Sequence, residues 1–262
     1  EVEEYTPTHH HHHSHRFNTT TTTTTTAKWT QINASSDNTT TSVLPEARSF
    51  HKMIAIGSNL YMFGGCGAAS GRLNDLWKFD TLTHKWTNLG VSHVLRGRGG
   101  PNILSLGHDE KIGIVGGFAG EETNDGHVYG ISSSDGVGLW EEEGMKGLEE
   151  MRPRSVCCFA SLPMVNKCVI FGGEVDPSQK GHEGAGGFER DVVILDGTSG
   201  SVLENIKPSG NEDEEEEEEW PGNRGWADAT VHEDTMYIFG GLAGDDASPI
   251  RLNDLWQCKV SP

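Results

Sequence analysis

The strongest constraint on the fold of this chain is an internal repeat. The hexapeptide Arg-Leu-Asn-Asp-Leu-Trp occurs twice, at 72–77 and at 251–256. Four short apolar segments each end in two glycines, at Gly64-Gly65, Gly116-Gly117, Gly172-Gly173 and Gly240-Gly241. An arginine precedes the first glycine of each pair by 16 or 18 residues, at Arg48, Arg98, Arg154 and Arg224. A unit that recurs with a spacing of about 50 residues predicts an array of equivalent supersecondary structures.

Each repeat has the pattern of four antiparallel strands. The apolar segment before the glycine pair is the second strand, and a third strand follows the next loop in the segments DLWKFD, GHVYGI, RDVVIL and NDLWQC. Segments around Trp86 and Trp140 predict a fourth strand in two of the repeats. One twisted sheet of four strands cannot bury both of its faces, so we expect several sheets to pack radially. The sequence therefore predicts an all-β propeller built of four-stranded blades.

With these motifs in order, residues 43–260 resemble the kelch family of β-propellers, whose repeat carries a double glycine, a spaced aromatic residue and a tryptophan. The four recognisable repeats are fewer than the blades of a six-bladed family, so we expect a truncated propeller or one whose N-terminal blades are missing. Closure as an ordinary five-bladed propeller is the alternative. We expect a partial N-terminal blade formed by Val2–Pro7 and Lys28–Ile32. We predict a single propeller domain over 1–262, which can be complete or incomplete. The domain contains a low-complexity insertion at 8–27 and an acidic insertion at 211–220.

The charge of the chain indicates which partners to expect, and its cysteine content indicates the cellular compartment. The formal net charge is −19, and 212–219 holds eight of the 39 acidic residues. An acidic chain repels nucleic acid and anionic lipid, so we expect neither as a partner. The acidic run is either a solvated loop, a site for a basic partner or a flap over a cationic pocket. Five cysteines without a CxxC pair favour reduced thiols and a cytoplasmic location, with a nuclear one and the oligomeric state left open.

The repeated arginines are the candidate ligand-binding residues. Antiparallel geometry places them on the same face as the loops that follow the glycine pairs. If the first strand of each blade is innermost, as the kelch resemblance implies, Arg48, Arg98, Arg154 and Arg224 surround the mouth of a central channel. Guanidinium groups there would bind an acidic peptide or a small anion through bidentate hydrogen bonds. The alternative is a structural role, in which each arginine donates to carbonyls of the next blade.

The segment 172–186, with the sequence GGEVDPSQKGHEGAG, points to a narrower resemblance. Together with GRLNDLW, GRGGP, VGGFAGEE and RPRSV, it is similar to the nitrile-specifier, epithiospecifier and thiocyanate-forming proteins of plants. The resemblance implies action on glucosinolate aglucones with ferrous iron held by Glu174 and His182. The middle ligand position holds Ser178 in place of an aspartate, and Asp176 is the nearest substitute. Serine is a poor ligand for ferrous iron, which prefers imidazole and carboxylate groups.

The leading expectation is therefore a binding module that is not an enzyme and has no cofactor. The chain has no GxSxG, phosphate-binding loop or HExxH motif. The alternative is a specifier-type protein with lyase-like activity that depends on Fe(II), in which one of the arginines holds the sulfate of the aglucone. The residue at the second position of the iron motif, Ser178, distinguishes the binding module from the iron-dependent protein.

Overall fold

The computed structural model divides the chain into two compact units, Glu1–Ile32 and Asn33–Pro262. It describes residues 29–32, 35–36, 44–131, 134, 137–180, 184–208 and 220–261. In the first unit the described residues 29–32 have no regular secondary structure, and Trp29 is 97% exposed. Of the predicted N-terminal partial blade, Val2–Pro7 lies outside the described residues and 29–32 form no strand.

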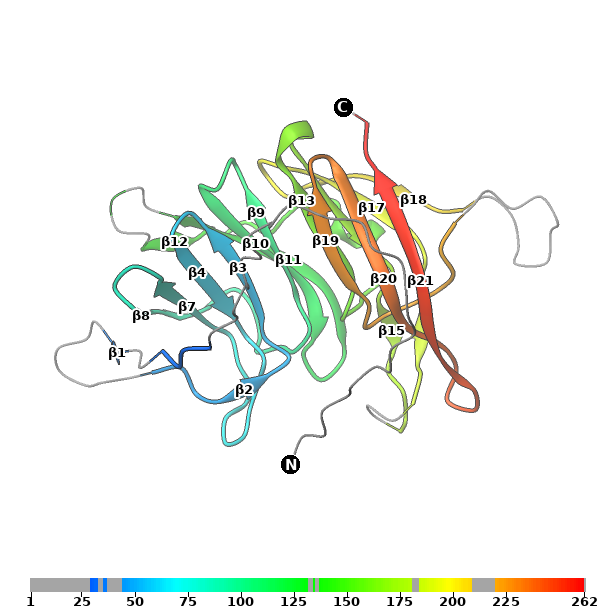
Figure 1. Ribbon diagram of the computed structural model, residues 1–262, viewed down its shortest axis with the longest axis horizontal. Coiled ribbons are helices and arrows are strands. Elements are labelled where there is room, and N and C mark those ends of the chain that lie inside the picture. Colours follow the sequence, from blue (N-terminus) through cyan, green and yellow to red (C-terminus); the bar gives the residue numbers. More distant parts are fainter. Residues whose placement is uncertain are drawn as a thin grey trace, which may run out of the picture. The chain divides into compact units, whose positions relative to one another are not determined.

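The second unit consists of four antiparallel sheets that follow one another along the chain (Figure 1). The first has the strand order β1-β8-β7-β4-β3, with β1 (Ser35–Ser36), β3 (Lys52–Ile56), β4 (Asn59–Phe63), β7 (Asp75–Asp80) and β8 (Lys85–Val91). The second has the order β12-β11-β10-β9, with β9 (Asn102–Leu106), β10 (Lys111–Phe118), β11 (Glu122–Ile131) and β12 (Gly138–Trp140). Apart from β1, which pairs in parallel with β8, each sheet is the predicted blade.

The third sheet has the order β13-β14-β17-β18, with β13 (Cys158–Leu162), β14 (Lys167–Phe171), β17 (Val192–Asp196) and β18 (Val202–Ile206). The fourth has the order β19-β20-β21, with β19 (Asp228–His232), β20 (Thr235–Gly244) and β21 (Pro249–Lys259). Short ribbons form at the loops from β2 (Arg48–Ser49), β5 (Cys66–Gly67) and β6 (Gly71–Arg72), and from β15 (Glu174–Asp176) and β16 (Gly187–Phe188).

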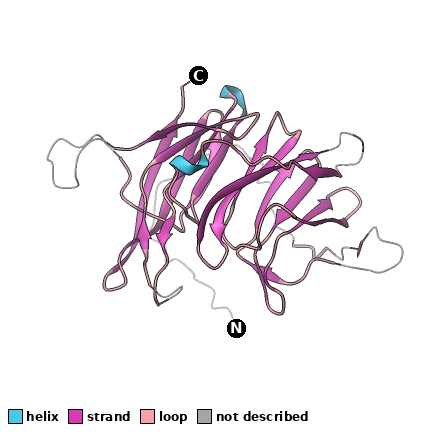
Figure 2. Ribbon diagram, turned by 180° about the vertical axis from the view of Figure 1, so that it is seen from behind, coloured by secondary structure: helices cyan, strands magenta, loops and turns pink. Residues whose placement is uncertain are grey.

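Helix is almost absent from the described residues, as Figure 2 shows from behind. Only two 3-10 turns occur there, η1 (Leu148–Glu150) and η2 (Pro163–Val165). No helix of the described chain is long and apolar enough to cross a membrane. The prediction of an all-β fold made of four-stranded blades is confirmed.

The first strand of every blade is the innermost one. The strands β3, β9, β13 and β19 pack side by side in chain order. A cavity of about 440 Å³ is lined by residues from all four strands, among them Ile54, Ile103, Phe159 and Val231. The blades are therefore arranged around a channel, with their inner strands as its wall.

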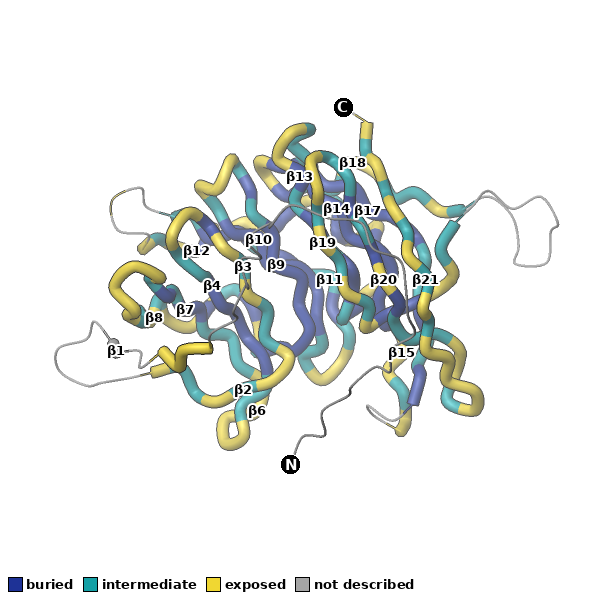
Figure 3. Tube along the Cα trace, viewed as in Figure 1, coloured by how far each residue is buried: buried dark blue, intermediate teal, exposed yellow. Residues whose placement is uncertain are grey.

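Apolar side chains between consecutive blades form the core. Figure 3 shows buried residues along β4 and β7 of the first blade and along β9 and β10 of the second. Tyr61, Phe63 and Leu76 of the first blade pack against Ile103 and Ile112 of the second, and all five are at most 1% exposed. The other two interfaces are built in the same way. Burial between blades, rather than within one sheet, stabilises the unit.

Three of the glycine pairs, Gly64-Gly65, Gly116-Gly117 and Gly172-Gly173, lie where one blade meets the next. Gly64 has φ +67°, and a Cβ there would lie 2.8 Å from the carbonyl oxygen of Arg98 in the next blade. Gly65, with φ +94°, donates its N–H to the same carbonyl at 2.9 Å. Any larger residue would push the blades apart, which explains why the pair recurs.

The fourth blade has one uncovered face. Leu255 and Phe239 are 68% and 57% exposed, whereas their equivalents in the first blade, Leu76 and Phe63, are fully buried. Among the described residues, β21 has no strand on its outer edge. The same hexapeptide therefore stands in two environments, one covered by a neighbouring blade and one open.

Candidate functional site

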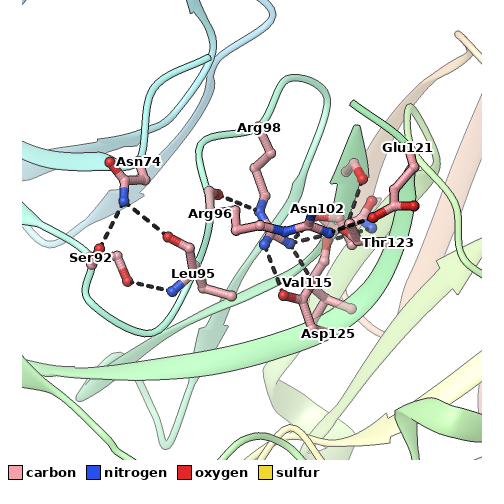
Figure 4. Close-up of polar contacts among 12 residues, drawn as sticks. Asn74, Ser92, Leu95, Arg96, Arg98, Asn102, Val115, Glu121, Thr123 and Asp125 are labelled. Carbon is pink, nitrogen blue, oxygen red and sulfur yellow. Dashed lines mark hydrogen bonds and ion pairs between the residues drawn. The ribbon is translucent and has the colours of Figure 1, made fainter. Parts of the chain in front are cut away.

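The four repeated arginines lie inside the blades. The side chains of Arg48, Arg98, Arg154 and Arg224 are at most 3% exposed. Each guanidinium forms a bidentate pair with an aspartate of its own blade, in the pairs Arg48–Asp75, Arg98–Asp125, Arg154–Asp191 and Arg224–Asp254. Figure 4 shows the group around Arg98, whose Nη1 also donates to Thr123 Oγ1 and to the carbonyl of Gly116 at 3.0 Å.

The aspartates of three of these pairs, Asp75, Asp125 and Asp254, have pKa values below the ordinary one. Burial alone would raise the pKa of Asp75, but the hydrogen bonds from Arg48 and Trp77 hold that pKa below its ordinary value. The hydrogen bond from Arg224 lowers the pKa of Asp254 to about 2. A bidentate, charge-assisted pair fixes geometry as well as charge. Each arginine therefore connects the glycine corner of its blade to the third strand or to the residue just before it.

These contacts can be compared with the two roles that the sequence suggested for the arginines, ligand binding and structural support. Their donors are engaged by an aspartate and by carbonyl groups, as the structural alternative required, although the carbonyl groups belong to the same blade and not to the next one. Direct contact between these guanidinium groups and a ligand stays a prediction. The aspartate partners were missed, although a signal was present. In each repeat an aspartate precedes apolar residues of the third strand, directly at Asp75, Asp191 and Asp254 and with two residues between at Asp125.

The residue two positions after each arginine has a left-handed backbone. These residues are Phe50 (φ 56°), Gly100 (φ 57°), Val156 (φ 47°) and Trp226 (φ 58°). Their N–H groups form a chain of hydrogen bonds across the blades, from Gly100 to Phe50 O at 2.9 Å, from Val156 to Gly100 O at 3.0 Å and from Trp226 to Val156 O at 3.0 Å. A positive φ is rare for a bulky or β-branched residue and costs about 1–3 kcal/mol. The blades together hold three such residues in a strained conformation at one place.

These four residues converge on a cavity of about 270 Å³, which we call the mouth cavity. Phe118 and Pro177 add further apolar walls. Arg72, from the first hexapeptide, lines the same cavity and is exposed, and its guanidinium lies 4.6 Å from the centre of the Phe118 ring. The cavity thus combines aromatic surface with a positively charged group that the sequence analysis did not single out.

A second cavity of about 570 Å³, which we call the side cavity, adjoins the mouth cavity. Phe50 and Trp226 line both, and their rings are in edge contact at 5.9 Å. Arg251, the first residue of the second hexapeptide, lines the side cavity and is exposed. The duplicated motif therefore places one arginine at each of the two adjoining cavities.

A partly buried acid, Glu122, contacts Ser155 in the wall of the mouth cavity. Glu122 Oε1 accepts a hydrogen bond from Ser155 Oγ at 3.2 Å, and Oε2 is buried with no hydrogen-bond partner in the described part of the chain. Burial, reinforced by the charges of Glu174 and Asp176, raises the pKa of Glu122 to about 7. This carboxyl group therefore keeps its proton to a higher pH than an ordinary glutamic acid does.

The structure does not assemble the predicted iron ligands among the residues that it describes. His182 lies outside them. Glu174 is 8% exposed and lines the mouth cavity, but Asp176 is exposed and pairs with Arg152 at 2.8 Å. Ser178 donates to Asp246 of the next blade instead. Over the described ranges, no three His, Cys, Asp or Glu side chains are placed to hold a metal ion.

Comparisons with known proteins agree with this architecture. The chain matches the model of the KLHDC2/KLHL20/DRC7 Kelch-repeats domain over residues 7–173. It is 29% identical over 210 residues to the N-(sulfonatooxy)prop-2-enimidothioate sulfolyase of Thlaspi arvense, covering 71% of this chain and 55% of that protein. It is 26% identical over 239 residues to host cell factor 2 of Homo sapiens, covering 84% of this chain and 27% of that protein.

Leucine-zipper-like transcriptional regulator 1 of Pongo abelii is 26% identical over 215 residues, which is 77% of this chain and 22% of that protein. The chain thus spans about half of the first of these relatives and about a quarter of the other two. The repeated glycine joints, the four-stranded blades with an inner first strand and the family match lead to one conclusion: the chain belongs to the kelch-repeat family.

Proposed function

We propose that the chain is a binding module that takes an acidic peptide segment or a small anion at the mouth cavity. Kelch-repeat membership and the kelch relatives support the general part of this proposal, an interaction module with a protein partner. The finer part rests on one observation. One left-handed residue from each of the four blades lines a single cavity beside the exposed guanidinium of Arg72.

The buried arginines and the exposed Arg72 have different roles in this proposal. Arg48, Arg98, Arg154 and Arg224 hold the corners of the blades, and the strained residues at the rim depend on those corners. Arg72 supplies the charge that an incoming carboxylate meets. Phe118 orients its guanidinium through a cation–π contact, which leaves the hydrogen-bond donors at the edge of the group available.

The test is a binding assay with fluorescein-labelled acidic peptides and counterparts in which Gln and Asn replace Glu and Asp. We expect Arg72→Ala to weaken acidic peptides about tenfold, because hydrogen bonds to charged groups contribute about 1.5–3 kcal/mol. Arg96→Ala is the matched control, since Arg96 is an exposed arginine already paired with Glu121 at 3.0 Å. Equal binding of acidic and neutral peptides, or an Arg72→Ala variant that binds like wild type, would contradict the proposal.

A second candidate is a specifier-type activity that depends on ferrous iron. The similarity to the sulfolyase of Thlaspi arvense favours it. The described residues do not fit an iron site, because Asp176 is paired with Arg152 and Ser178 with Asp246. Anaerobic titration with Fe(II) decides the matter: stoichiometric binding that is lost in Glu174→Gln would favour this candidate over the binding module. The absence of a cofactor and the cytoplasmic location stay predictions.

A further inference from the structure

We infer that Arg251 forms a second anion subsite in the side cavity, so that the preferred partner segment carries two acidic groups on either side of an apolar residue. This inference rests on the proposed function and names the ligand class of the same face. Binding at this second subsite would add a charge contact with Arg251 and an apolar contact to the charge contact at Arg72.

The duplicated hexapeptide is the first step of the argument. Arg72 and Arg251 hold the same position in the motif, and both are exposed. In the described part of the chain neither lies within ion-pair distance of a carboxylate. Arg96 and Arg152, two other exposed arginines, are both paired with acidic side chains. Arg72 and Arg251 thus keep their charge available for a ligand.

The shared wall is the second step. Phe50 and Trp226 separate the two cavities, and these residues are 36% and 38% exposed. Leu242 and Leu252 extend the apolar surface on the side of Arg251. An aromatic or aliphatic side chain that lies across this wall would lose contact with water on both faces. The acidic groups on either side of it would then face one arginine each.

The charges of the neighbouring loops are the third step. Asp246 accepts hydrogen bonds from Ser178 Oγ and from the N–H of Gln179, the latter at 3.2 Å, and Asp176 is paired with Arg152. These carboxylates are engaged within the protein, which reduces their competition for the guanidinium groups. Two bidentate acceptors in the ligand would complement the two guanidinium groups that are left.

The experiment uses labelled peptides that contain two Glu residues separated by one, two or three residues, one of them Leu. Each has counterparts in which Gln replaces one Glu. We expect the best peptide with two Glu residues to bind about tenfold more tightly than its counterparts with one. Arg251→Ala should remove that advantage and leave the affinity for the counterparts within about twofold. Arg251→Lys should restore part of it, because lysine keeps the charge without the planar fork.

Lys259→Ala is the matched control, since Lys259 is another exposed cation of β21. Circular dichroism of all variants verifies that the fold is intact. If Arg72→Ala weakens every acidic peptide but Arg251→Ala weakens none, the second subsite does not exist and the proposed function stands. If neither variant loses affinity, both proposals fail. Equal affinity for one and two Glu residues would also overturn the inference.

Discussion

Arg154→Met is the sharpest test of what the repeated arginines do. The side chain of Arg154 is fully buried, and Asp191 is 3% exposed. The guanidinium donates to both oxygens of Asp191, to the carbonyl of Gly172 and to the carbonyl of Arg152, the last two at 3.0 Å. Methionine would leave the buried carboxylate of Asp191 and the buried carbonyl of Gly172 without these donors.

The expected loss follows from that burial. Breaking a buried pair by removing one partner costs about 3–5 kcal/mol, a large part of the roughly 5–15 kcal/mol that stabilises a typical domain. Arg224→Met should cost less, about 1–2 kcal/mol, because Asp254 is 37% exposed and can be hydrated. Urea denaturation followed by tryptophan fluorescence measures both. Arg154→Met/Asp191→Leu should recover at least half of the loss, since it removes the stranded charge.

Two results would refute this reasoning. The first is an Arg154→Met variant that is as stable as Arg224→Met. The second is a double variant no more stable than the single one. A third result, unchanged stability with lost binding of acidic peptides, would make Arg154 a ligand-binding residue, as the sequence predicted, and would move the anion site to the inner corners of the blades.

Two further predictions concern stability. Because the pKa of Glu122 is raised from 4.5 to about 7 in the folded state, the folded protein binds this proton more tightly than the unfolded chain, and the free energy of unfolding should fall as pH rises from about 4.5 to 7. Glu122→Gln should lack that fall and be more stable than wild type at pH 8 by about 2 kcal/mol in urea denaturation, which is the pKa shift converted at about 1.4 kcal/mol per unit and reduced because water screens this partly exposed group; equal stability at pH 8 would contradict it. Leu76→Ala should cost about 3 kcal/mol, whereas Leu255→Ala, at the same motif position but 68% exposed, should stay within about 0.5 kcal/mol in the same assay. Equal losses would mean that the fourth blade is covered in solution.

The fold could be predicted from the sequence because each joint between blades uses the same residues. The glycine pair must be glycine, since its backbone has positive φ and lies against the carbonyl of the next arginine. The apolar alternation then specifies which face each strand buries. Among the outer strands of the blades, β18 (Val202–Ile206) was not foreseen, because it has neither a tryptophan nor a strict alternation to mark it.

The site could be predicted only in part. The sequence placed the arginines correctly at one phase of the repeat, but it could not tell whether their charge faces a ligand or an aspartate. The distance along the chain from each arginine to its aspartate partner varies between 27 and 37 residues, so no fixed spacing links them. The exposed arginines that line the cavities, Arg72 and Arg251, stand inside a repeated motif, where a purely structural role was the natural interpretation.

The left-handed residues at the rim link the packing of the blades to the mouth cavity, where we propose that the ligand binds. Gly100 is the residue that local sterics would favour at this position, yet the equivalent positions hold Phe50, Val156 and Trp226. Hydrogen bonds from one blade to the next hold them there, so the packing of the blades offsets about 1–3 kcal/mol of strain at each. Packing alone would be served equally well by glycine, because the side chains of Phe50 and Trp226 are more than one third exposed. The strained positions are therefore best explained by what these side chains contact at the mouth, which is why the cavity that they line is the place to look for the ligand.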